Sequence, residues 1–285
     1  MTQHDPQYQY VEGQARPTFA ALLAAYEAEG ASAIAAQPCM LDLPYGPAER
    51  QRFDFFPAPG QASATLIYLH AGYWQARDKA GFRFLAPVLT QRQLNVALVN
   101  YPLCPAVSLA ALVEAVRACV PAVLARVAAA GQPAQALLAA GHSAGAHLAV
   151  ELALSRWPEL GARAQAVDGV LALSGIYDLA PLLDTSLNIR LGLDADSASA
   201  LSPLHRVRPA AAPALFVVGG DETPAFIAQN QCMHQAWQAA GNPSAAQVVA
   251  GADHFSLLRA LTAPDRSLSA GMALLLQQAQ QRFRG

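Results

Sequence analysis

The sequence predicts an α/β fold in which a mostly parallel, doubly wound sheet carries helices on both faces. Short apolar segments recur along the chain, and helical segments separate them, as in repeated βαβ units. Most of these apolar segments do not alternate with polar residues, which is typical of strands covered on both faces of a parallel sheet. The expected strands are 64–71, 95–101, 134–141, 169–175, 212–220 and 245–251.

Helical periodicity fills the intervals between these strands, and it predicts helices at 79–91, 108–130, 144–157, 223–240 and 265–283. A further helix is expected at 18–35, outside the sheet. Two earlier segments, 39–46 and 50–58, alternate more clearly and have no helix between them. They predict an antiparallel hairpin at the edge of the sheet.

The expected organisation is an N-terminal helical extension at 1–36 followed by a single α/β domain at 37–285. Within that domain, residues 176–212 are long for a connection from a strand to a helix, and they predict a small lid-like segment over the strand ends. Ligands of such sheets bind outside the carboxyl ends of the strands. The chemistry is therefore expected at that edge.

Composition excludes some classes of partner. A net charge of −2 without a long basic run argues against nucleic acid as the main partner. The longest charge-free stretch near the centre, 127–150, is interrupted by turn-forming residues, and the polar N-terminus lacks the features of a signal peptide. The four scattered cysteines suggest free thiols. We expect a cytoplasmic protein that binds a small molecule and no membrane; the sequence leaves a homodimer open.

One short pattern suggests a nucleophile. Gly141-His142-Ser143-Ala144-Gly145 matches G-x-S-x-G, follows an apolar strand and opens a helix. That is the setting of a nucleophile elbow, in which a strained turn exposes a serine hydroxyl at a helix N-terminus. Ser143 is therefore the candidate nucleophile.

The base is expected far from Ser143 in sequence. His142 lies in the same tight turn and His147 one helical turn further on, so both are expected to support the elbow rather than take its proton. Of the histidines downstream, His254 follows the last strand, on a loop at its carboxyl end. His254 is the predicted base.

The acid is expected after the preceding strand, since the order along the chain in this architecture is serine, acid, histidine. Asp221 follows two glycines at the end of such a strand, and it is the predicted acid. Its neighbour Glu222 is an alternative, and Asp178, after the strand before, is a second one.

The oxyanion hole is expected to combine the N–H of Ala144 with N–H groups from the loop after the 64–71 strand. In that loop, Gly72 allows a close approach of the backbone, and Gly72 and Tyr73 are the predicted donors. The ring of His70 is expected to brace the loop. Trp74 in the same loop is a predicted substrate contact, as is Tyr177.

Several motifs together resemble a known family. The chain is similar, over roughly residues 40–280, to the α/β-hydrolase fold on its hormone-sensitive-lipase-like side, and within it to the kynurenine formamidase (arylformamidase) group. The resembling segments are HAGYW at 70–74, NYPLCP at 100–105, GHSAGAH at 141–147, LSGIYDLAPL at 173–182, GGDE at 219–222 and DHF at 253–255. Ala71 departs from the group, which usually has glycine at that position.

The resemblance implies a serine hydrolase that converts N-formylkynurenine to kynurenine and formate, with Ser143, Asp221 and His254 as its triad. It implies neither a metal nor an organic cofactor. The same motifs also fit a general carboxylesterase for short acyl esters. A binding protein built on the same fold is the third reading, but it would normally have lost a member of the triad.

Overall fold

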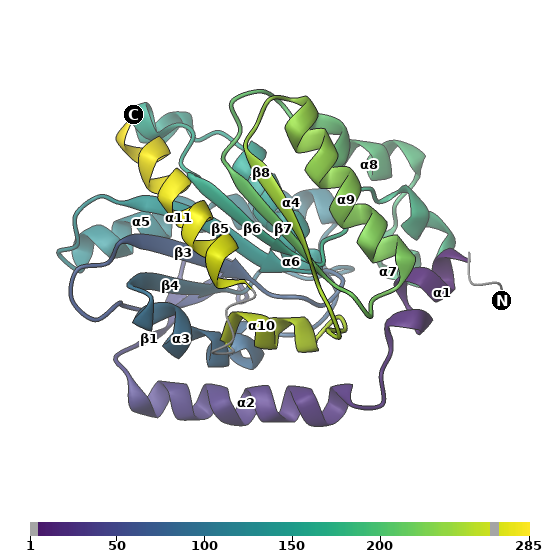
Figure 1. Ribbon diagram of the computed structural model, residues 1–285, viewed down its shortest axis with the longest axis horizontal. Coiled ribbons are helices and arrows are strands. Elements are labelled where there is room, and N and C mark those ends of the chain that lie inside the picture. The colour runs from purple at the N-terminus through teal and green to yellow at the C-terminus, as the bar shows by residue number, and fades with distance from the viewer. Residues whose placement is uncertain (1–4, 263–267) are drawn as a thin grey trace.

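The computed structural model describes residues 5–262 and 268–285. The strands within these residues form one sheet (Figure 1) with the order β1-β2-β4-β3-β5-β6-β7-β8. From β4 to β8 neighbouring strands are parallel, whereas β2 pairs antiparallel with both β1 and β4. The strands are β1 (Met40–Pro44), β2 (Arg52–Phe56), β3 (Ala64–Leu69), β4 (Leu94–Val99), β5 (Ala136–His142), β6 (Gly169–Leu173), β7 (Ala214–Gly219) and β8 (Ser244–Val249).

Helices cover both faces of the sheet, as the sequence predicts. Figure 1 shows α11 crossing in front of the strands with α4 and α6 behind them. The helices, with η for 3₁₀ turns, are α1 (Pro6–Tyr10), η1 (Glu12–Gln14), α2 (Phe19–Ala36), η2 (Lys79–Leu85), α3 (Ala86–Gln91), α4 (Leu109–Arg117), α5 (Cys119–Ala129), α6 (Ala144–Leu154), η3 (Pro158–Arg163), η4 (Ala180–Asp184), α7 (Asn188–Leu191), α8 (Ala195–Ala200), η5 (Pro203–Arg206), α9 (Pro224–Ala239), η6 (Ser256–Leu258), α10 (Arg259–Thr262) and α11 (Ser269–Arg284).

Two apolar clusters explain why the strands are apolar at every position. In β3, Ile67 and Leu69 enter the cluster beneath α4, α5, α6 and α9. Leu66 and Tyr68 enter the cluster on the other face, beneath α3 and α11. Successive strand residues point to opposite faces, and here both faces are buried.

The predicted helices are confirmed with slightly different bounds, and prolines account for the divisions within them. The helix expected at 108–130 divides into α4 and α5, because Pro121 has no N–H to continue the ladder. Pro87 lies in the first turn of α3, where the helix predicted at 79–91 divides into η2 and α3. The helix expected to reach 157 ends at Leu154, where Ser155 is extended with φ −80° and ψ 168°. Trp157, which precedes a proline, is also non-helical, with φ −123°. Residues 265–267 of the last predicted helix lie outside the described residues.

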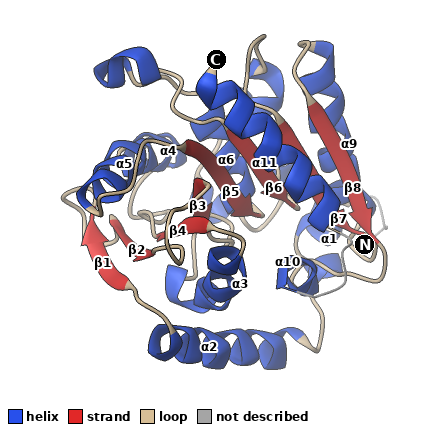
Figure 2. Ribbon diagram, turned by 60° about the vertical axis from the view of Figure 1, so that its left-hand side comes forward, coloured by secondary structure: helices blue, strands red, loops and turns tan. Residues whose placement is uncertain are grey.

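The helix predicted at 18–35 is present as α2, and Figure 2 shows it beneath α3 and α10, away from the sheet. Among the described helices, α2 alone is long and apolar enough to cross a membrane, by length and composition only. Its Tyr26 is fully buried and stacks on Phe84 with ring centroids 3.8 Å apart. Tyr26 also donates to the carbonyl of Phe255 at 2.9 Å, so α2 contacts a loop that follows β8.

Because β3 and β5 to β8 are parallel, their carboxyl ends lie along one edge of the sheet. The loops at that edge carry Ser143 after β5, Ser174 after β6, Glu222 after β7 and His254 after β8. The segment that begins at His70 follows β3 at the same edge. Residues separated by more than a hundred positions of sequence are thus brought to one rim.

Candidate active site

The turn between β5 and α6 holds Ser143 in a strained conformation, with φ 58° and ψ −120°. A Cβ at Gly141 would lie 2.0 Å from the Gly145 carbonyl oxygen, and one at Gly145 would lie 1.9 Å from that of Leu69. Both glycines of the motif are therefore required by close backbone contact. The Ser143 hydroxyl is buried and has no hydrogen-bond partner among the described residues.

A carboxylate orients His254. Its Nδ1 lies 2.7 Å from Glu222 Oε2, and both side chains are buried. A carboxylate accepts a hydrogen bond, so Nδ1 carries the proton and donates it. The other nitrogen, Nε2, is then the unprotonated atom of the neutral ring. The imidazole is therefore held in the tautomer that a general base requires.

The predicted acid, Asp221, is wrong: its side chain is exposed, and Glu222 occupies the position next to His254. The turn after β7 explains this. The N–H groups of Gly220 and Asp221 donate to the carbonyls of Val249 and Ala252, at 2.8 and 2.9 Å. These bonds fix the turn with position 221 outward and position 222 inward. The second alternative, Asp178, accepts from the N–H of Ala180 and takes no part.

Ser174 is a residue of this site that the sequence reasoning did not identify. Its hydroxyl donates a short hydrogen bond to Glu222 Oε1, which also accepts from the N–H of Gly219 at 2.8 Å. The carboxylate thus has one oxygen for His254 and the other for these two donors. The sequence signal for Ser174 was its position at the carboxyl end of β6, next to β7, the strand that Glu222 follows.

The loop after β3 presents backbone N–H groups at the same edge. Gly72 has φ +134°, and a Cβ there would lie 2.1 Å from the carbonyl oxygen of Ala76, so only glycine fits. Tyr73 follows with φ 50°. The N–H of Ala144, the first residue of α6, has no carbonyl one turn earlier to bind. Gly72, Tyr73 and Ala144 therefore remain the predicted donors of the oxyanion hole.

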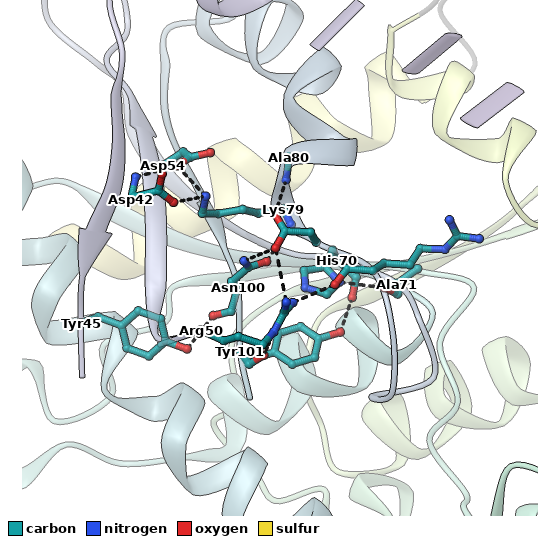
Figure 3. Close-up of polar contacts among 12 residues, drawn as sticks. Asp42, Tyr45, Arg50, Asp54, His70, Ala71, Lys79, Ala80, Asn100 and Tyr101 are labelled. Atoms are coloured by element: carbon teal, nitrogen blue, oxygen red, sulfur yellow. Dashed lines mark hydrogen bonds and ion pairs between the residues drawn. The ribbon is translucent and has the colours of Figure 1, made fainter. Parts of the chain in front are cut away.

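A polar network braces the far side of this loop (Figure 3). Arg50 donates to the carbonyls of Arg77 and Tyr101, at 2.7 and 3.0 Å, and pairs with Asp78 at 3.4 Å. Asn100 donates to the same Asp78 carboxylate at 2.6 Å. The loop backbone is thereby fixed to the strand end after β4.

The one lysine of the chain completes this network. Lys79 is buried, and its Nζ lies 2.8 Å from Asp54 and 2.7 Å from Asp42. The backbone N–H of Lys79 donates to Asn100 Oδ1 at 2.7 Å. Asp54 also pairs with Arg83 at 2.7 Å. A buried charge needs such partners, so this cluster ties the loop to the β1–β2 hairpin.

The other histidines near the elbow are structural, as expected. His70 donates from Nδ1 to the Ala71 carbonyl at 2.7 Å and stacks on Tyr101 with centroids 4.3 Å apart. His142 packs beside His254, with centroids 4.6 Å apart. His147 lies 2.9 Å from the carbonyl of Leu201 through Nε2. Burial lowers the pKa of His70 and His147 to about 4, and it lowers the pKa of His142 as well.

These buried histidines should make the fold sensitive to acid. Since the pKa of His147 falls from 6.5 unfolded to about 4 folded, the unfolded state binds more protons below pH 6.5. The free energy of unfolding therefore decreases as the pH falls through that window. Urea unfolding of wild type and His147→Gln at about pH 7 and about pH 5 should show a smaller decrease in the variant, by about 2 kcal/mol. His205→Gln, at an exposed histidine, is the control, and equal decreases in all three would contradict the assignment.

Ser143 and His254 line one cavity of about 500 Å³. Its described wall also includes Arg77, Phe255 and the loop after β3, together with residues of the N-terminal segment: Val11, Gln14, Ala15 and Phe19. No residue of 176–212 is among these lining residues. The wall that the sequence assigned to that segment is formed instead by residues before β1.

The two predicted substrate contacts, Trp74 and Tyr177, are wrong because both side chains are buried in the protein core. Trp74 is fully buried and meets the ring of His147 edge-on, with centroids 5.1 Å apart. Tyr177 is equally buried and packs edge-on against Phe216 at 5.8 Å. Neither lines the described cavity. The positive φ of Trp74, 60°, belongs to the loop conformation in which its side chain is buried.

Comparison with known proteins finds one family, one relative and two solved structures that are similar to this chain. The BD-FAE family matches residues 55–236. The kynurenine formamidase of Danio rerio is 31% identical over 229 residues, 78% of this chain and 76% of that protein. Among solved structures, one from Silicibacter sp. TM1040, described as a thioesterase, is 30% identical with a TM-score of 0.79 and covers 92% of this chain and 96% of its own. Esterase B of Lactobacillus rhamnosis shares the fold at 16% identity, with a TM-score of 0.72 and coverages of 93% and 98%.

Proposed function

Since this chain belongs to the BD-FAE family, we propose that it hydrolyses a small aryl formamide, N-formylkynurenine, to the aryl amine and formate. The chain has the α/β-hydrolase fold and is a hydrolase of the formamidase and esterase type. The observation that carries the proposal is the shared cavity of Ser143 and His254, with His254 bound to Glu222. The 31% identity to a kynurenine formamidase supports the choice of substrate.

The first half of the reaction transfers the formyl group. Ser143 Oγ bonds to the formyl carbon while its proton passes to Nε2 of His254. Glu222 stabilises the imidazolium through Nδ1 and remains ionised. The imidazolium then gives its proton to the departing nitrogen, the C–N bond breaks, and the amine leaves.

The second half repeats the sequence with water. His254 takes a proton from a water molecule while the water oxygen bonds to the formyl carbon. The imidazolium then gives that proton to Ser143 Oγ as the bond between Oγ and the formyl carbon breaks, and formic acid leaves and ionises to formate. In both halves the negative charge on the carbonyl oxygen faces the N–H groups of Ala144 and of the loop at Gly72 and Tyr73. Removing one such donor typically costs about 10²–10³ in rate.

The alternative is a carboxylesterase for short acyl esters, which would use the same residues. Its support is the shared fold of the esterase structures. An ester leaving group needs less help from the proton of His254 than an amine does. The two functions therefore differ in substrate and not in the site.

A panel of substrates separates the two. We expect kcat/KM for N-formylkynurenine to exceed that for p-nitrophenyl acetate, with formate and kynurenine released in equal amounts. Negligible cleavage of the formamide beside rapid cleavage of the ester would replace the first proposal by the second. Labelling of Ser143 by a fluorophosphonate probe, lost in Ser143→Ala, is expected in either case, and its absence would contradict both.

The same proposal includes a cytoplasmic location. All four cysteines are free, and Cys104 and Cys119 are buried. Reduced thiols are the usual state of cysteine in that compartment. The reaction as written needs no cofactor.

A further inference from the structure

The cavity that contains Ser143 carries one fixed positive charge. Of its described lining residues, Arg77 is the only one with an ionised side chain, and no Asp or Glu lines it. No described carboxylate forms an ion pair with the Arg77 side chain. Arg77 is exposed and also borders a neighbouring cavity, where Glu27 acts on it electrostatically without an ion pair. A guanidinium that has no acidic partner among the described residues and lies beside a reacting group is available to an anionic ligand.

Arg77 is held in place without using its donors. Its guanidinium lies over the ring of Phe255, 4.8 Å from the centroid, and its backbone carbonyl accepts from Arg50 at 2.7 Å. Figure 3 shows Arg50 among the polar contacts that fix this loop. Stacking on a ring occupies the face of the guanidinium and leaves the N–H groups at its edge, which match a carboxylate in pairs.

A second lining residue, Gln14, offers an unused acceptor. Its side chain is buried, and Oε1 has no partner among the described residues. The orientation of the amide follows from its neighbour. Thr223 donates its hydroxyl proton to the Gln9 carbonyl at 2.7 Å, so it must accept from Gln14 Nε2, at 3.1 Å. An orphaned buried acceptor is costly unless a ligand supplies a donor.

We propose that Arg77 and Gln14 are the specificity-determining residues of this cavity: Arg77 binds the carboxylate of the amino-acid substrate, and Gln14 Oε1 accepts from its ammonium group. The inference rests on the proposed hydrolysis at Ser143 and names the residues that select its substrate. Both residues belong to the wall around Ser143, and the two groups offer opposite chemistry, a cation and a hydrogen-bond acceptor. Neutral aryl formamides and simple esters supply neither contact, so the amino-acid end of the substrate is the specificity determinant.

Substrates that differ only in charge test the carboxylate contact. Wild type is expected to prefer N-formylkynurenine over its methyl ester by about tenfold or more in kcat/KM, mainly through KM. Arg77→Gln should remove that preference, and Arg77→Lys should retain part of it. Arg284→Gln, at an exposed arginine of α11, should leave it unchanged. No preference in wild type, or an undiminished one in Arg77→Gln with native circular dichroism, would overturn the proposal.

The ammonium contact is tested with the desamino analogue of the same substrate. Gln14→Met removes the acceptor with little change in volume, and it should reduce the preference for the amino compound by about threefold or more. An unchanged ratio would remove Gln14 from the proposal.

A competition assay separates failure of this inference from failure of the proposed function. If the formamide is not cleaved, kynurenine and its methyl ester can be compared as inhibitors of p-nitrophenyl acetate turnover. Tighter inhibition by kynurenine, lost in Arg77→Gln, would support the recognition site while the formamidase reaction fails. Equal inhibition by the two would overturn the recognition site itself.

Discussion

Ser143→Ala is expected to lower kcat by about 10⁴- to 10⁶-fold with either a formamide or an ester. The variant keeps the glycines that the turn requires and removes only the atom that bonds to the acyl carbon. The Ser143 hydroxyl has no described hydrogen-bond partner, so its removal leaves no other group unpaired. The free energy of unfolding should therefore stay within about 1 kcal/mol of wild type. Steady-state kinetics and urea unfolding check the two expectations together.

The double variant Ser143→Ala/His254→Ala tests whether the two residues act in the same catalytic step. Groups that act as one unit give losses that do not add. The second substitution should thus cost little beyond the first. If the two losses multiply, His254 acts on a step that does not involve Ser143, and the proposed mechanism fails.

The sequence predicts the sheet well because its signals are local. Apolar strands between turn formers and the alternating hairpin at 39–58 both depend on neighbouring residues alone. Ser143 is the candidate nucleophile for the same reason, since the glycines beside it make contacts that follow from the turn itself. His254 followed from chain order and from its place after the last strand.

The remaining features depend on contacts between distant parts of the chain. Residues 11–19 reach the cavity because Gln14 bonds to Thr223 and the Tyr73 hydroxyl donates to the Tyr10 carbonyl. The local sequence around these residues does not predict either hydrogen bond. The side-chain direction of Trp74 could not be predicted from sequence either. An aromatic residue in a loop can face a ligand or the core, and the backbone angles determine which.

The choice between Asp221 and Glu222 is the clearest case. Both acids follow the same strand, and either could reach a histidine on the next loop. The outcome depends on hydrogen bonds from the 220–221 backbone to carbonyls about thirty residues later. The longer side chain then lies inward, where Ser174 and Gly219 bind its other oxygen. Sequence pattern alone contains none of these bonds.

Glu222→Gln is accordingly expected to lower kcat by about 10³- to 10⁴-fold, whereas Asp221→Asn should change it by less than about threefold. The amide can keep Oε1 as the acceptor for Ser174 and Gly219, so the fold should persist. Its NH₂ group then faces His254 Nδ1 and can only donate. Nδ1 must become the acceptor, and the ring proton moves to Nε2, the atom that should receive the proton of Ser143.

The two variants are matched, since each replaces a carboxylate by an amide at adjacent positions of one turn. Kinetics with p-nitrophenyl acetate and near-UV circular dichroism provide the comparison. Glu222→Asp adds a second measure: it keeps the charge but shortens the reach to Nδ1, and a loss of about 10- to 100-fold is expected. If Asp221→Asn were as inactive as Glu222→Gln, the hydrogen bond at 2.7 Å between Glu222 and His254 would not be the one that supports catalysis.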